Sequence, residues 1–190
     1  MKMIETTLPD VKVFEPQIYE DRRGFFFESY NQRNFSQAIG REISFVQDNH
    51  SKSIKNTLRG LHIQLKSPQA KLIRVISGEI YDVAVDLRKN SPCFGKWYAQ
   101  ILNSESKRMI WIPEGFAHGF FVISDTAEIF YKASTYYDPN DEFTLNWNDP
   151  TLAIPWPTQG IQPLLSEKDQ IGKSLNELYN LSFGFFRPFA

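Results

Sequence analysis

The fold class of this chain is decided by residues 71–87, KLIRVISGEIYDVAVDL. Two runs rich in Val and Ile lie on either side of Ser77-Gly78, a dipeptide typical of a tight turn. β-Branched residues favour strands because their side chains pack well on a pleated surface. The stretch therefore predicts two antiparallel strands joined as a hairpin.

Strand-like segments of the same kind extend in both directions from this stretch. Towards the N-terminus they lie within residues 3–16, 24–30, 43–51 and 57–65, and towards the C-terminus within residues 96–102, 108–113, 119–124 and 127–137. Turn signals separate them, including Pro92, Asn103-Ser104 and Pro113-Glu114-Gly115. Many short strands without intervening helices predict an all-β fold, which is a closed β-sandwich, a jelly roll or a barrel.

Helices are expected only at the periphery of this single domain, which spans residues 1–190. One is predicted over residues 32–39, where Gly40 ends the pattern. Another is predicted to begin near Ser166 and to run toward Tyr179. The aromatic tail of residues 181–190, LSFGFFRPFA, is very apolar, so we expect it to pack on its own domain or on a partner subunit.

Composition excludes several classes of function. The 190 residues have a formal net charge of −1 and no run of Lys or Arg, which argues against nucleic acid or an anionic membrane surface as the main partner. No apolar stretch approaches the roughly 20 residues needed to span a bilayer, and charged residues near the N-terminus exclude a signal-peptide core. Cys93 is the only cysteine, which fits a reducing cytoplasm and excludes a disulfide framework.

The stretch TLRGLHIQ, residues 57–64, places polar chemistry in an expected strand. Simple alternation puts Arg59 and His62 on opposite faces, unless Gly60 forms a bulge that turns one of them. A polar group in a buried strand lowers stability unless it is paired or used. The pair therefore indicates either a satisfied core histidine with an arginine at a strand end, or a functional site.

A metal site is the first chemistry to consider, because two histidines in a β-barrel or sandwich invite one. His62 and His118 are the strong candidate ligands, and His50 is remote from both. Gln64 stands where metal-binding cupins have the second histidine of a His-x-His pair. Catalytic zinc and iron sites usually take three or more protein ligands. We therefore expect no metal, which leaves His62 free to accept a proton.

Eight segments occur in a fixed order along the chain: DRRGFFFESY, FVQDNHSKS, TLRGLHIQ, KLIRVISGEIYDVAVDLRKNSPCFGKW, IPEGFAHGFFVISD, YKASTYYDP, LNWNDPTLAIPWP and LSEKD. Together they closely resemble the dTDP-4-dehydrorhamnose 3,5-epimerase family, and the resemblance runs from about residue 3 to residue 170. It implies a cupin-like jelly roll or β-sandwich, a homodimer, and no metal or other cofactor. It also implies a cytoplasmic role in dTDP-rhamnose biosynthesis, of the kind that supplies lipopolysaccharide O-antigen.

The implied reaction is epimerisation of dTDP-4-dehydro-6-deoxy-D-glucose at C3 and C5, where the C4 ketone makes both C–H bonds acidic. By resemblance, His62 is the general base, Asp169 orients its imidazole, and Tyr131 protonates the opposite face of the ring. Lys71 is implied to offset the charge that develops on the C4 oxygen, and His118 to contact the sugar.

The resemblance also implies a set of substrate-binding residues. No glycine-rich phosphate loop is present, so side chains must meet the charge of the diphosphate. The implied positions are Arg23, Phe26, Glu28, Gln47, Asp48, Asn49, Arg59, Lys71, His118, Tyr137, Glu142 and Lys168. Arg23 and Arg59 are implied to contact the diphosphate, because arginine suits bidentate contact with phosphate. Glu28 is implied to accept from the thymine imide, and Tyr137 to stack on the thymine ring. Sites of the family draw residues from both subunits, so we expect some of these residues to act across the dimer.

Each of these roles has a simpler structural alternative. Asp169 follows Ser166 by three residues and can be the far half of a helix capping box. Tyr131 can be a core aromatic residue, Lys71 a solvated residue at a strand end, and residues 21–24 an ordinary charged turn.

Functional alternatives stay open as well. A single-carbon epimerase, or a ketoisomerase that acts on a related dTDP-4-keto-6-deoxy sugar, shares the same base and nucleotide contacts. A non-catalytic sugar-binding cupin would not need His62, Tyr131 and Asp169 together, and a metal-dependent cupin oxygenase lacks ligands. We therefore expect an isomerase that inverts C3 and C5.

Overall fold

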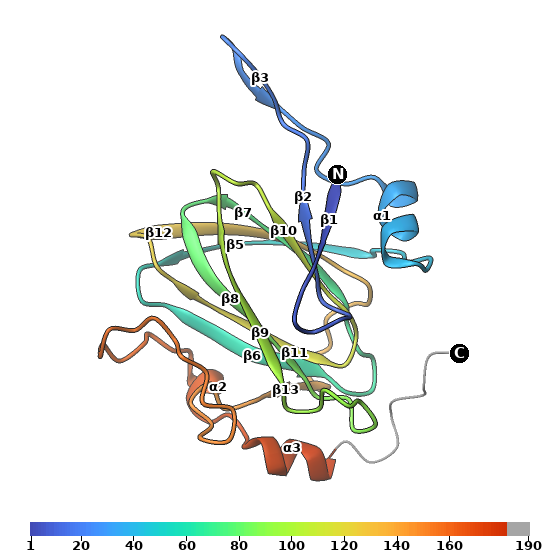
Figure 1. The fold of residues 1–190 in the computed structure, drawn as a ribbon. Coiled ribbons are helices and arrows are strands. Elements are labelled where there is room, and N and C mark those ends of the chain that lie inside the picture. The colour runs from blue at the N-terminus through green and yellow to red at the C-terminus, as the bar shows by residue number, and fades with distance from the viewer. Residues whose placement is uncertain (182–190) are drawn as a thin grey trace.

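Two antiparallel β-sheets face each other in the computed structural model, which describes residues 1–181 (Figure 1). The six-stranded sheet has the order β1 (Lys2–Glu5), β2 (Lys12–Glu15), β10 (Met109–Ile112), β7 (Lys71–Ser77), β12 (Thr126–Ala133) and β5 (Gln47–Ile54). The five-stranded sheet has the order β13 (Glu142–Thr144), β6 (Leu58–Gln64), β11 (Phe116–Val122), β8 (Glu79–Asp86) and β9 (Trp97–Asn103). The expected all-β, cupin-like sandwich with short peripheral helices is confirmed.

A separate hairpin of β3 (Tyr19–Asp21) and β4 (Gly24–Phe26) projects from the sandwich (Figure 1). Arg23 closes its turn, because the backbone N–H and guanidinium of Arg23 both donate to the Asp21 carboxylate. The charged turn that the sequence allowed as an alternative at residues 21–24 lies at the tip of an exposed arm.

Residues 71–87 form two strands, but the expected hairpin between them is wrong. β7 pairs with β10 and β12, whereas β8 pairs with β11 and β9 in the other sheet. The chain crosses between the sheets at Gly78, which has a φ of +82° and where a Cβ would lie 2.1 Å from the Thr126 carbonyl oxygen. A Ser-Gly signal marks a change of chain direction and carries no information about which strands pair afterwards.

Three short helices lie outside the sheets. α1 (Gln32–Ile39) is confirmed as expected, with Asn31 as its N-cap and Gly40 in the left-handed region after it. The single helix expected from Ser166 toward Tyr179 is instead two helices, α2 (Glu167–Gln170) and α3 (Leu175–Leu181). Between them, Lys173 forms a β-bridge with Leu145, which holds the chain extended and interrupts the helix. Beyond Leu181, the aromatic tail lies outside the described residues. None of the helices in the described chain has the length and apolar character to cross a bilayer.

Strand β8 of the five-stranded sheet is buried on both faces, between the six-stranded sheet and α3. Ile80 and Ala84 of β8 face the six-stranded sheet in one apolar cluster. Val83, which points the other way, belongs to a second cluster with Leu175 and Leu178 of α3. The alternating side chains of a strand thus contact two different layers.

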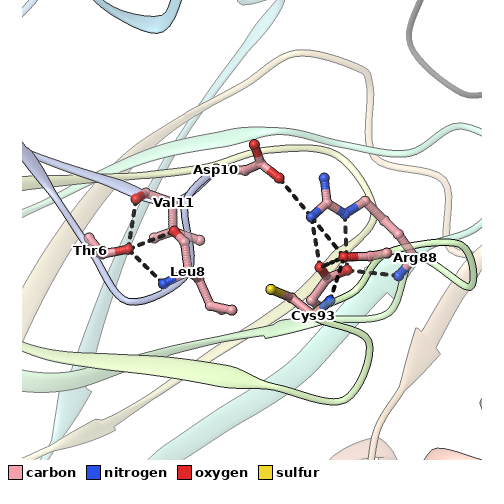
Figure 2. A network of polar contacts seen from close by, with 8 residues as sticks. Thr6, Leu8, Asp10, Val11, Arg88 and Cys93 are labelled. Atoms are coloured by element: carbon pink, nitrogen blue, oxygen red, sulfur yellow. Dashed lines mark hydrogen bonds and ion pairs between the residues drawn. The ribbon is translucent and has the colours of Figure 1, made fainter.

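A polar network ties the loop after β1 to the segment that follows β8 (Figure 2). Arg88 donates to both carboxylate oxygens of the buried Asp86, at 2.9 and 2.7 Å, and forms an ion pair with Asp10 at 2.7 Å. The hydroxyl of Ser91 donates to the same Asp86 carboxylate at 2.6 Å. Both oxygens of Asp86 are therefore satisfied, and the free thiol of Cys93 packs beside the network against the core.

Strands β6 and β11 approach each other unusually closely where two glycines meet. Gly60 has a φ of +103°, and a Cβ there would lie 2.5 Å from the carbonyl oxygen of His118. A Cβ on Gly119 would lie 2.5 Å from the carbonyl oxygen of Arg59. Neither backbone can move away without disturbing the ladder, so both positions require glycine.

The Gly60→Ala variant is expected to be strongly destabilised, because alanine adds both a strained backbone and a backbone clash. We expect the free energy of unfolding to fall by about 3 kcal/mol or more. Gly40→Ala is the matched control, since Gly40 also has a positive φ but has nothing within 4 Å of a built Cβ. That change should remove only about 1–2 kcal/mol. Equal losses for the two variants in urea unfolding would contradict the close approach.

Candidate active site

A cavity of about 620 Å³ lies between the two sheets. One wall comes from β5, β7 and β12 of the six-stranded sheet, and the facing wall from β6, β11 and β13 of the five-stranded sheet. Residues 164–169, which include the start of α2, form its edge. The segment is held there because Leu164 exchanges backbone hydrogen bonds with the chain at Asn56 and Leu58.

The bulge at Gly60 explains how Arg59 and His62 can line the same cavity. His118 of β11 pairs with His62, and Phe120 pairs with Arg59, so β6 has one more residue than β11 between these pairs. The extra residue turns the strand, and both side chains line the same cavity. Simple alternation would have sent them to opposite faces.

His62 is held by a buried carboxylate. Its Nε2 lies 2.6 Å from Asp169 Oδ1, and the Ser166 hydroxyl donates to Asp169 Oδ2 at 2.7 Å. Burial opposes ionisation of this carboxyl, yet the hydrogen bonds from His62 and Ser166 hold the pKa of Asp169 below its ordinary value. Ser166 is at the same time the N-cap of α2 and accepts from the Asp169 N–H. The capping box and the contact with His62 therefore coexist.

The second ring nitrogen of His62 is available to a ligand in the cavity. A carboxylate at Nε2 favours the tautomer with its proton on Nε2, which leaves the lone pair on Nδ1. The nearest carboxylate oxygen to Nδ1 is Glu142 Oε1 at 3.8 Å, which is too far for a hydrogen bond. His62 thus has the geometry of an oriented general base.

Tyr131 belongs to the wall opposite His62. It lies on β12, between Asn49 of β5 and Ile73 of β7, and it lines the cavity while packing against the core. Burial, and then the negative charge of Glu142, raise the pKa of the Tyr131 phenol above its ordinary value. The phenol therefore keeps its proton at neutral pH and can act as an acid.

The sequence allowed Lys71 to be a solvated residue at the end of a strand, but the structure places it in the wall of the cavity. It begins β7 and lines the cavity. Burial lowers the pKa of its ammonium to about 8, while the charges of Glu142 and Asp82 oppose that shift. A desolvated cation in this place can stabilise an oxyanion far better than one in water.

Glu142 links several polar groups of the cavity. Its carboxylate forms an ion pair with Lys168 and accepts from the Tyr137 hydroxyl at 3.3 Å. Tyr137 is held further by its backbone N–H, which donates to Gln47 Oε1 at 2.9 Å. Gln47 in turn donates to Asn49. These residues form a continuous polar lining beside His62.

Gln64 has a structural task at the position where metal-binding cupins have histidine. Its amide donates to the Ser67 carbonyl at 2.8 Å and accepts from the Asp138 N–H at 3.0 Å, which fixes the loop that carries Tyr137. Within residues 1–181, no group of three or more His, Cys, Asp or Glu side chains is placed to hold a metal ion.

Arg59 and His118 complete the described lining. The Arg59 guanidinium donates to the Ser53 hydroxyl at 2.9 Å and to the Lys52 carbonyl at 3.5 Å, and the residue is exposed where it lines the cavity. His118 Nε2 lies 2.8 Å from Asp82 Oδ2, and both side chains are buried.

Most of the residues expected from the sequence meet in this cavity. The residues brought together are Gln47, Asn49, Arg59, His62, Lys71, His118, Tyr131, Tyr137, Glu142, Lys168 and Asp169. Arg23, Phe26 and Glu28 lie outside it, on or just after the projecting β3–β4 arm. Asp48 lies on the outer face of β5, where it binds the Lys132 ammonium at 2.9 Å. The sequence paired Ser166 with Asp169 only as a helix cap, and it did not indicate that the same hydroxyl holds the carboxylate bound to His62. It also did not indicate Asp82 as a partner of His118.

Known proteins resemble this chain over nearly its whole length. A family model described as dTDP-4-dehydrorhamnose 3,5-epimerase matches residues 5–177. The dTDP-4-dehydrorhamnose 3,5-epimerase of Pseudomonas aeruginosa is 55% identical over 174 residues, which cover 92% of this chain and 96% of that enzyme. The corresponding Escherichia coli enzyme is 49% identical over 183 residues, covering 95% of this chain and 98% of that enzyme. A crystal structure of dTDP-6-deoxy-D-glucose-3,5-epimerase from Legionella pneumophila, in complex with dTDP-4-keto-L-rhamnose, superposes with a TM-score of 0.94. It is 46% identical and covers 98% of this chain and 99% of that one.

The Ser166→Ala variant is expected to lose activity through Asp169. Removal of the hydroxyl frees one carboxylate oxygen, so we expect kcat to fall roughly 10-fold, as for other groups that orient a catalytic side chain. The lost helix cap should also lower the free energy of unfolding by about 1 kcal/mol.

Ser174→Ala is the matched control for this change. Ser174 caps α3 through the N–H of Glu177, away from the cavity. It should lose similar stability and keep wild-type kcat. Equal kcat values for the two variants in a steady-state assay would show that Ser166 acts only as a cap.

Proposed function

The chain belongs to the dTDP-4-dehydrorhamnose 3,5-epimerase family, and we propose that His62 and Tyr131 carry out its reaction from opposite walls of the cavity. The protein is an isomerase that inverts C3 and C5 of dTDP-4-dehydro-6-deoxy-D-glucose and yields dTDP-4-dehydro-L-rhamnose. The observation that carries the proposed mechanism is the origin of the two residues. His62 comes from the five-stranded sheet and Tyr131 from the six-stranded sheet, so a sugar ring between them meets a base on one face and an acid on the other.

Proton abstraction begins each inversion. The C3–H and C5–H bonds are acidic because the electrons released can spread onto the C4 ketone. Nδ1 of His62 takes the proton, and the carboxylate of Asp169 at Nε2 stabilises the imidazolium that forms. The electron pair of the broken C–H bond moves to the C4 oxygen and gives an enolate.

Enolate stabilisation and reprotonation complete the step. The Lys71 ammonium offsets the charge on the C4 oxygen, in the manner of an oxyanion hole. Tyr131 donates its phenol proton to the carbon from the opposite face, and the configuration inverts. The raised pKa of Tyr131 keeps that proton in place until the strongly basic enolate carbon is present.

The other polar residues of the cavity bind the substrate. Arg59 meets the diphosphate, and His118 contacts the sugar. Tyr137 stacks on the thymine ring, and the side chains of Gln47, Asn49, Glu142 and Lys168 make polar contacts. No phosphate-binding loop is needed, because charged side chains already converge on the cavity.

The β3–β4 arm supports a homodimer in which each subunit completes the site of the other. Its aromatic residues Tyr19, Phe25 and Phe26 are 58%, 59% and 72% exposed, an unusual state for large apolar side chains. Arg23, Phe26 and Glu28 are expected substrate contacts, yet they lie outside their own subunit's cavity. An arm that reaches across a two-fold axis buries the aromatic residues and delivers these contacts to the partner. The resemblance also implies that Asp48 makes a polar contact with the substrate. That contact stays part of this proposal, although Asp48 lies on the outer face of β5. The free Cys93 fits a cytoplasmic enzyme.

Separate variants test the proposed roles of His62 as the general base and Tyr131 as the general acid. His62→Ala should lower kcat by roughly 10²–10⁴-fold while dTDP affinity stays near wild type, since the base touches the sugar and not the nucleotide. Tyr131→Phe should retain exchange of C–H protons with solvent but lose inversion. Tyr136→Phe, a neighbouring exposed tyrosine outside the cavity, should behave as wild type. A Tyr131→Phe enzyme that inverts at the wild-type rate would place the acid elsewhere.

Contribution of the arm in trans is tested by complementation. Arg23→Ala and His62→Ala should each be poorly active alone. In a mixed dimer, the intact arm of one subunit meets the intact cavity of the other, which restores one of the two sites. Random pairing on co-expression makes about half of the dimers mixed, so about a quarter of wild-type activity should return overall. If the arm instead contributes to the cavity of its own subunit, the mixed dimers should regain no activity.

A further inference from the structure

Asp82 occupies an unusual place for a carboxylate. It points into the sandwich from β8 with Ile80 and Ala84 on either side of it, and all three residues are fully buried. Its outward neighbours, Tyr81 and Val83, pack on the other face of the sheet. A carboxylate in such surroundings lowers stability unless partners compensate for its lost hydration.

Only one of its oxygens is compensated within the described chain. Asp82 Oδ2 lies 2.8 Å from His118 Nε2, whereas Oδ1 is buried and has no hydrogen-bond partner among residues 1–181. Asp86, four residues along the same strand and equally buried, shows the contrast. Both of its oxygens are bonded by Arg88, and Ser91 adds a further bond. Asp86 is therefore a satisfied structural carboxylate, and Asp82 is not.

The groups that face Asp82 belong to the candidate active site. His118 comes from the neighbouring strand β11 and lines the cavity. Lys71 comes from β7 of the opposite sheet and lines the cavity, and the charge of Asp82 opposes the lowering of its pKa by burial. The other charges that act on Lys71 are Glu142 of β13, which attracts it, and Lys168 of α2, which repels it. Glu142 and Lys168 already form an ion pair with each other, so each weakens the effect of the other.

We propose that Asp82 is a positioning residue of the epimerase reaction, which fixes the imidazole of His118 and adds its charge to that of Glu142 in favouring the Lys71 ammonium. This inference rests on the proposed roles of Lys71 and His118 in binding the sugar and its enolate. Because Nε2 of His118 is tied to Asp82, Nδ1 is the ring nitrogen left to contact the sugar. The buried charge of Asp82 also favours the charged form of Lys71, the cation proposed to meet the C4 oxygen.

The pH dependence of kcat/KM separates this role from a purely structural one. The Lys71 ammonium is charged below its pKa of about 8 and neutral above it, so wild-type kcat/KM should fall as the pH rises through about 8. Asp82→Asn removes the charge and keeps the size of the side chain. Without that attraction the ammonium loses its proton at lower pH, so the alkaline limb should move down by roughly one pH unit. A shift of one unit from about 8 leaves roughly half of the ammonium charged at pH 7, so kcat/KM should fall about 2-fold there and approach a 10-fold loss above pH 8.

Asp86→Asn is the matched control, because it removes an equally buried carboxylate from the same strand. It should lower stability while the alkaline limb stays at its wild-type pH. An Asp82→Asn enzyme whose limb also stays at the wild-type pH would overturn the proposed effect of the Asp82 charge on Lys71. Wild-type kcat/KM with no alkaline limb would contradict the proposed role of Lys71 and therefore this part of the inference.

A measurement on the unmodified protein tests the contact with His118 even where Asp82→Asn does not fold. The chain has three histidines, so ¹⁵N NMR can assign the tautomer of each ring. We expect neutral His118 to carry its proton on Nε2, facing Asp82. A proton on Nδ1 would overturn the positioning of His118, and this outcome does not depend on catalysis.

Discussion

The close approach of β6 and β11 at Gly60 and Gly119 is the constraint on which the site depends. Two backbones can meet there because neither residue has a Cβ, and the extra residue in β6 then turns Arg59 and His62 toward one cavity. Without that bulge, one of the two side chains would enter the apolar layer beneath α3. A local backbone requirement in a single strand thereby decides whether the proposed base and the arginine proposed to contact the diphosphate can reach the same ligand.

Buried carboxylates organise the chemistry around that cavity. Asp169 links His62 to the first turn of α2, so the helix cap and the proposed base share one hydrogen-bond network. Asp82 stands behind His118, and Asp86 braces the fold away from the site. Asp82 and Asp86 share one strand and the same burial, yet only Asp86 has an arginine to satisfy it. The unsatisfied oxygen is a sign that part of its function concerns the cavity.

Sequence patterns predicted most of the strands and α1, because alternation and caps are local properties, whereas most of the cavity residues were implied by the resemblance to a known family. The predictions failed where contacts between residues far apart in the sequence determine the structure. The Ser77-Gly78 signal fits a hairpin and a crossing between sheets equally well, and the long-range bridge between Leu145 and Lys173 breaks the helix expected after Ser166. The effect of Gly60 was foreseen as a possibility and needed the register with β11 to be decided. Asp82 looked like any polar residue in a strand until its neighbours were known.

The most direct measurement is NMR of dTDP-4-dehydro-6-deoxy-D-glucose incubated with the unmodified protein in deuterated water. A base and an acid on opposite walls exchange the abstracted proton for solvent deuterium while the carbon inverts. The expected result is deuterium at both C3 and C5, with a product that a reductase converts to the L-rhamnose nucleotide. The absence of deuterium at both carbons would contradict the mechanism and leave the cavity as a binding site alone.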